Sequence, residues 1–228
     1  MSPIQPGGST NVCVRFLLPA LNIDEVLEQT NRDGIRRTLQ QLPSGLSAAF
    51  GKVMERIERL PEARRDLAKS VILWVSHVQR PITLDELREA IAATSNPSCL
   101  NPESLTPGKI LIEFCQGLVA VDEKTSIVRL VHSAFQEYIQ AHKEILFPRG
   151  DKLISLACIS YLSVQDFNSG SLGQFSFQDV ELASRDQLSN ASINEFKFRD
   201  YAEHFWGDHA RQDFDNRGVN NSSRLTLT

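Results

Sequence analysis

The sequence predicts a mainly α-helical fold with one small β-hairpin, on the basis of three local observations. Apolar residues recur at three- and four-residue spacing over residues 64–78, which is the period of an amphipathic helix. Thr83 and Glu86 have the spacing of a capping box, in which a hydroxyl and a carboxylate accept hydrogen bonds from free amides at a helix start. The runs 118–121 and 127–131 are rich in valine and flank polar residues, as the strands of a hairpin do.

Ahead of these elements, two helices are expected to form an arm. The first begins at Asp33, and the second covers residues 46–60 and ends before Pro61. Their inward faces would be Ile35, Leu39 and Leu42 in the first, and Leu46, Phe50, Val53, Met54, Ile57 and Leu60 in the second. The chain start is rich in Gly, Ser and Pro, so residues 1–14 are expected to be disordered and residues 15–60 to form the helical arm.

The central region has an order of elements that is typical of a winged helix. Pro81 ends the first helix, the capping box starts a second, and a loop with several prolines leads to a compact helix at residues 110–116. Gly117 ends that helix, because glycine tolerates the left-handed conformation found at helix C-termini. Three helices followed by a hairpin, with residues 118–131 as the wing, predict a winged helix over residues 61–147.

Helices are also expected beyond the wing. Ser133 and Gln136 have capping-box spacing and start a helix that runs toward Pro148. A further helix covers residues 152–162, and the last one covers residues 194–211. Their buried residues would be Leu153, Ala157 and Tyr161, followed by Tyr201, Ala202, Phe205 and Trp206.

The C-terminal part of the chain is therefore expected to contain one helical segment and a tail. Residues 148–211 form the helical segment, within which residues 175–188 fit either a helix or irregular structure. Residues 212–228 are polar and are expected to be a disordered tail.

Composition and charge exclude several classes of protein. At 228 residues, with 41% hydrophobic and 23% charged residues, the chain has the composition of a globular protein. A net charge of −4 disfavours binding to nucleic acid and to anionic membranes. No secretory signal and no apolar run near the roughly 20 residues of a membrane-spanning helix occur. The four cysteines form no C-x-x-C pair, so we expect reduced thiols and a cytoplasmic location.

The sequence lacks the motifs of the enzyme classes that its length would permit. Neither a G-x-S-x-G esterase elbow nor a G-x-x-x-x-G-K-[ST] phosphate loop occurs. His204 and His209 have a spacing that permits metal binding, but without a cysteine pair a surface or partly packed position is favoured. Asp85, Glu86 and Glu89 are expected to be a cap and a solvated helix face rather than catalytic carboxylates. We therefore predict no enzymatic activity and no metal site.

Several separated motifs, taken in order, resemble one known domain. They are Leu73-Trp74-Val75, Arg80-Pro81-Ile82-Thr83 with Glu86-Leu87, Cys115 with residues 117–122, residues 128–132 with 136–138, Tyr201-Ala202, Trp206-Gly207 and His209-Ala210-Arg211. This order is similar to the winged helix of fungal NACHT and ankyrin-repeat proteins, a domain called the GPI inositol-deacylase winged helix. The likeness covers most of residues 36–211. It implies a fragment of a signal-transducing NTPase that lacks the P-loop module and the ankyrin repeats, with the arm at the end of a NACHT-like module.

The resemblance also implies a role for His132. In NACHT and NB-ARC proteins, a Met-His-Asp motif between a strand and a helix reaches the bound ADP, and the matching residues here are Val131, His132 and Ser133. By this resemblance, His132 would contact the β-phosphate of a nucleotide held by a missing or separate NACHT module. The chain itself is expected to hold no cofactor. The alternative is a buried histidine whose ring nitrogen bonds to the backbone, and the sequence leaves both open.

The function implied by the resemblance is a non-enzymatic regulatory module that contacts a protein partner and keeps a nucleotide-binding module closed. A helical interaction scaffold without any link to nucleotides is the alternative. A DNA-binding winged helix is a second, disfavoured alternative. Its recognition helix would be residues 109–116, where only Lys109 and Gln116 suit DNA contacts and Glu113 repels phosphate.

Overall fold

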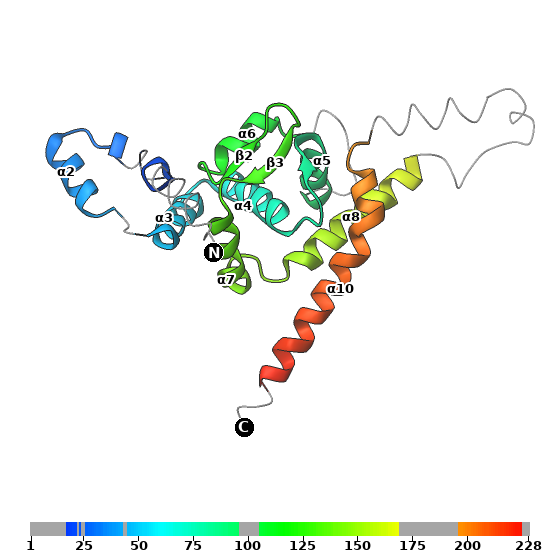
Figure 1. Cartoon of the computed structure of the whole chain (residues 1–228). Helices are drawn as coiled ribbons and strands as arrows, with labels where there is room; N and C mark the ends of the chain where they lie inside the picture. Colours follow the sequence, from blue (N-terminus) through cyan, green and yellow to red (C-terminus); the bar gives the residue numbers. More distant parts are fainter. Residues whose placement is uncertain are drawn as a thin grey trace, which may run out of the picture.

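The computed structural model describes residues 17–21, 23, 26–42, 45–95, 105–168 and 196–224 (Figure 1). The fold is mainly helical with one small antiparallel sheet, so the predicted fold class is confirmed. Predictions for the following segments lie outside the described residues: 1–14, the proline-containing loop at 96–104, residues 175–188, and 225–228. In the described part of the chain, no helix combines the length and apolar content that a bilayer crossing requires.

Two helices form the predicted arm, α2 (Arg32–Gln40) and α3 (Leu46–Glu58). Helix α3 packs against the body through a continuous apolar stripe that includes the fully buried Phe50. The predicted inward position of Leu39 on α2 is wrong, because this side chain is 53% exposed. Helix α2 lies apart from the body in Figure 1, and its Ile35 is only half-buried.

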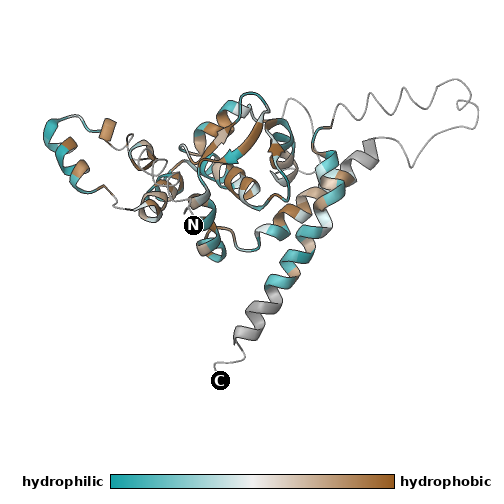
Figure 2. Ribbon diagram, viewed as in Figure 1, coloured by the Kyte–Doolittle hydropathy of each residue, from teal (hydrophilic) through white to brown (hydrophobic). Residues whose placement is uncertain are grey.

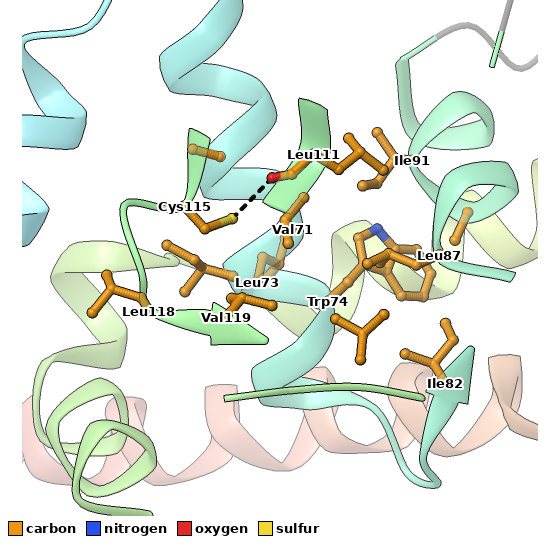
Figure 3. Packing of buried hydrophobic residues seen from close by; sticks show 14 of the residues in the cluster. Val71, Leu73, Trp74, Ile82, Leu87, Ile91, Leu111, Cys115, Leu118 and Val119 are labelled. Atoms are coloured by element: carbon orange, nitrogen blue, oxygen red, sulfur yellow. Dashed lines mark hydrogen bonds between the residues drawn. The ribbon is translucent and has the colours of Figure 1, made fainter. Parts of the chain in front are cut away.

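Helices α4 (Glu62–His77), α5 (Leu84–Ser95) and α6 (Gly108–Phe114) surround the main core. Figure 3 shows the buried side chains that these helices and the adjacent strands contribute, with Trp74 among them. The predicted capping box is present, because Glu86 Oε2 accepts a hydrogen bond from the Thr83 amide at 2.7 Å and the Thr83 hydroxyl oxygen accepts one from the Glu86 amide at 3.4 Å.

The wing belongs to a sheet with the strand order β1-β3-β2. The predicted hairpin consists of β2 (Val119–Val121) and β3 (Ile127–Leu130), which pair antiparallel. Gly117 has a φ of +79°, the left-handed conformation that was expected there. Strand β1 (Ile82–Thr83) was not predicted, because a two-residue strand that follows a proline and ends at the helix cap shows no alternating pattern.

Helices α7 (Ser133–Leu146), α8 (Gly150–Asn168) and α10 (Arg199–Arg224) complete the fold. Helices α8 and α10 lie side by side and run antiparallel, since the start of α8 contacts the middle of α10 and the middle of α8 contacts its beginning (Figure 1). Two side chains predicted to be buried are instead largely exposed: Leu153 at 46% and Trp206 at 43%. The face of α10 that meets α8 carries Tyr201, Ala202 and His209, and Trp206 lies beside that face.

The predicted end of the last helix at Arg211 is wrong, because α10 continues to Arg224. Residues 212–224, expected to be part of a disordered tail, are therefore helical. The contacts that hold this part are polar: the buried Asp213 pairs with Arg149 at 3.2 Å, and Asn216 accepts a hydrogen bond from Lys143 at 3.4 Å. The coloured part of α10 in Figure 2 is mainly hydrophilic, and Phe214 is the only apolar residue among residues 212–216, so the spacing of apolar residues gave no sign of this continuation.

A buried carboxylate connects the winged helix to the α8–α10 pair. Glu89 on α5 is 8% exposed and accepts hydrogen bonds from the Tyr161 hydroxyl at 2.5 Å and from the Phe198 amide at 3.0 Å and the Lys197 amide at 3.2 Å. The prediction that Glu89 lies on a solvated face is wrong, because α8 and the segment before α10 cover that face of α5. Helix periodicity within α5 carries no information about elements that lie far away in the sequence.

We expect Glu89→Gln to lower the free energy of unfolding by roughly 2–4 kcal/mol, since hydrogen bonds to a buried charged group contribute about 1.5–3 kcal/mol each. The amide would direct its own N–H groups toward donors that need an acceptor. Urea unfolding followed by tryptophan fluorescence measures the change. Glu137→Gln, at an exposed position of α7, is the control and should stay within about 0.5 kcal/mol of the wild type. Equal stability of the two variants would contradict this role of Glu89.

Candidate functional site

His132 lies at the junction between β3 and α7 and is the N-cap of α7. Its backbone is extended, with φ −157° and ψ 148°, and its Nδ1 accepts a hydrogen bond from the Ala134 amide at 3.0 Å. The predicted capping box of Ser133 and Gln136 is therefore wrong. Ser133 is the first residue of the helix, and Gln136 Nε2 instead donates to the Ser76 carbonyl at 2.9 Å, which ties α7 to α4.

The cap determines which nitrogen of His132 carries the proton. Because Nδ1 accepts from an amide, the proton of the neutral imidazole is on Nε2. Among the described residues, none forms a hydrogen bond with Nε2. The ring is half-buried, so the structure gives the backbone bond expected for a packed histidine and also leaves one N–H donor at the surface.

A shallow groove, here called the His132 groove, has His132 among its lining residues. Its walls are the link Val78–Pro81 between α4 and β1, strand β3, and the first turn of α7. Val75 and Leu130 supply apolar surface. Arg129, which is exposed on the wing, adds a positive charge near His132. The groove thus combines apolar contact area with two groups that can donate to an anion.

The two histidines weighed as metal ligands have different environments. His204 is exposed, whereas His209 is fully buried, so the expected surface or partly packed position does not hold for His209. His209 Nε2 bonds to the Tyr201 hydroxyl at 2.8 Å, and its Nδ1 bonds to Asp151 Oδ1 at 2.8 Å. In the described ranges, no group of three or more His, Cys, Asp or Glu side chains has the arrangement of a metal site. Sequence reasoning missed Asp151, which is far from His209 along the chain.

The bond directions in this network follow from one backbone donor. The Gln79 amide donates to the Tyr201 hydroxyl at 3.1 Å, so the hydroxyl proton is free to go to His209 Nε2. His209 Nδ1–H then donates to the Asp151 carboxylate. The order of groups is that of a hydrolase triad, but Tyr201 and His209 are both fully buried. A substrate has no access to them, so the network is structural.

Comparison with known proteins identifies the central part of the chain. Residues 54–146 match the family described as "GPI inositol-deacylase, winged helix domain". The winged helix described above lies within this match. The resemblance inferred from the sequence is thereby confirmed. The matched segment of the winged helix domain contains all strands of the described sheet and His132, and it ends before α8.

One curated relative shares part of the chain. Vegetative incompatibility protein HET-E-1 of Podospora anserina is 27% identical over 130 residues, which are 51% of this chain and 9% of that protein. The match therefore spans only a small part of HET-E-1, and it relates this winged helix domain to a NACHT-containing protein. No solved structure matches the chain.

Substitution of His132 should separate its capping role from its surface donor. His132→Ala removes the cap of α7 and should lower the free energy of unfolding by about 0.5–2 kcal/mol, whereas His132→Ser retains an oxygen that can accept from the helix amides and should restore most of it. Thermal and urea unfolding measure both changes. If the two variants are equally destabilised, the side chain at position 132 does not act as the N-cap.

His77, at the end of α4, should make stability depend on pH. Burial lowers the pKa of His77, although the nearby Asp151 opposes this effect. The unfolded chain therefore takes up a proton first as the pH falls. Stability should be complete above about pH 6.5 and should decrease below it, by at most about 1.4 kcal/mol per pH unit for this one proton. Urea unfolding between about pH 7.5 and 5.5 tests this, and a His77→Gln variant with an unchanged slope would contradict it.

Proposed function

We propose that this chain is a non-enzymatic regulatory module of a NACHT-type signalling protein. Residues 15–60 would be the arm that ends a NACHT-like module, residues 61–147 the winged helix domain, and residues 148–211 a helical segment that extends it. The winged helix domain would pack on a nucleotide-binding module and hold it closed. The relation to HET-E-1 supports this proposal at the level of family. The observation that carries it is the surface Nε2–H of His132.

The chemistry of the junction suits a phosphate. His132 offers one N–H donor whose direction is set by the cap, and Arg129 adds a positive charge on the same groove. His132 lies at the N-terminus of α7, where the helix dipole favours an anion, and Arg129 lies on the adjacent strand β3. The apolar side chains of the groove provide area for a protein surface that carries the nucleotide.

The nucleotide itself would be held mainly by the partner module. The P-loop motif that cradles phosphates is not encoded in this sequence, and a single imidazole with one arginine supplies few of the contacts that a nucleotide needs. His132 would then act as a sensor that binds better when ADP is present in the other module. The buried free thiols of Cys115 and Cys158 fit a reducing compartment, so we also propose a cytoplasmic location in a fungal cell.

The test is binding of the purified chain to the nucleotide-binding module of HET-E-1 with ADP, with ATP and without nucleotide, measured by isothermal titration calorimetry. Binding should be tightest with ADP, and His132→Ser should weaken it by about tenfold or more, as expected for one lost charge-assisted hydrogen bond. Gln140→Ala, on the same helix but outside the His132 groove, is the matched control and should bind like the wild type.

Two results would contradict the proposal. An affinity that depends neither on the nucleotide nor on the His132→Ser change would favour the helical interaction scaffold without a link to nucleotides. Hydrolysis of ATP by the chain alone, above the rate without protein, would show an enzyme. We do not propose DNA binding, because only Lys109 is basic among the exposed residues Lys109, Ile110 and Glu113 of α6.

A further inference from the structure

The link Val78–Pro81 has two sides. One side forms a wall of the His132 groove, and the other is held by the first turn of α10. The Gln79 amide donates to the Tyr201 hydroxyl at 3.1 Å, and Arg80 Nη2 donates to Asp200 Oδ2 at 2.9 Å. The conformation of this wall therefore depends on a helix that lies outside the winged helix domain.

Arg80 fixes the shape of the link itself. Its Nη1 donates to the Pro81 carbonyl at 3.0 Å, and its Nη2 also donates to Glu86 Oε1 at 2.7 Å. The guanidinium carbon lies 5.3 Å from the centroid of the Tyr201 ring, which is the geometry of a cation–π contact. Arg80 thus connects the link, the cap of α5 and α10 through one side chain.

The α10 side of this contact is rigid. Tyr201 is fully buried, stacks on Phe198 at 5.4 Å between ring centroids, and bonds to His209, which in turn bonds to Asp151 on α8. A buried polar network whose groups are all hydrogen-bonded makes the elements that it joins rigid relative to one another. A displacement of the α8–α10 pair would carry the link with it.

We propose that Asp200 and Tyr201 are positioning residues for the His132 groove, so that α10 controls what the groove binds. A protein that engages the exposed part of α10, or a change that loosens its first turn, would then alter the groove without touching His132. The biological importance of this control by α10 rests on the proposed function of the His132 groove. The mechanical coupling between α10 and the groove does not depend on that function and can be tested in the chain alone.

The experiment is amide hydrogen exchange of the whole chain with Asp200→Asn and Glu203→Gln. Both substitutions remove one exposed carboxylate from the start of α10. Glu203 pairs with Arg199 and Asp200 pairs with His204, both within α10, but only Asp200 also contacts Arg80. Asp200→Asn should speed exchange at residues 79–80 and across the groove at residues 127–134 by about two- to fivefold, the range expected for one exposed ion pair. Glu203→Gln should leave both segments unchanged. Equal exchange maps, or an Asp200→Asn effect confined to α10, would overturn the proposal.

A second pair of variants keeps the test independent of the ion pair. Tyr201→Phe removes the hydroxyl that holds Gln79, and Tyr161→Phe removes the hydroxyl that holds Glu89 in the same interface. Both should lose stability, but only Tyr201→Phe should speed exchange at residues 127–134. In the binding assay with ADP, Tyr201→Phe should also weaken binding more than Tyr161→Phe does. If no complex forms with any variant while the exchange difference persists, the proposed function fails and the coupling stands.

Discussion

The burial of Trp74 is the constraint on which the rest of the structure depends. Its indole is fully buried, and its Nε1 donates to the Thr94 hydroxyl of α5 at 3.4 Å. Its ring meets the edge of Phe198, just before α10, at 5.3 Å between centroids. One large side chain of α4 therefore packs against both the winged helix domain and the helical pair that follows it. Since aromatic side chains bury the largest apolar areas, these elements share one core.

This shared core decides which parts of the fold the sequence reveals. The stripes of α3 and α4 and the wing were predicted, because helix and strand periods are local properties. Glu89 was assigned to solvent and Trp206 to the core, and both assignments are wrong. The face of α5 that carries Glu89 is covered by Tyr161 and Phe198, which lie 72 and 109 residues away in the sequence. The continuation of α10 beyond Arg211 was missed for a related reason, since polar pairs such as Arg149 with Asp213 leave no periodic signal.

The candidate site was only partly accessible to sequence reasoning. The position of His132 between a strand and a helix was predicted, but its capping role was not, because Ser133 is by composition the more usual cap. The network of Tyr201, His209 and Asp151 was not foreseen at all. Its order of groups resembles a catalytic triad, but Tyr201 and His209 are fully buried and closed to substrates. This network therefore gives no support to the deacylase activity that the family name mentions.

The two nitrogens of His132 point in different directions and have opposite roles. Nδ1 accepts a hydrogen bond from the Ala134 amide of α7, and Nε2 carries the N–H that the proposed function assigns to a ligand in the His132 groove. A serine or aspartate at this position would begin the helix equally well but would not reach outward, and a lysine or arginine would reach outward but has no acceptor for the helix. If position 132 must both cap α7 and donate a hydrogen bond outward, this would explain why a histidine is present where shorter side chains make equally good caps. Position 132 would then be intolerant of substitution for a reason that stability measurements alone do not show.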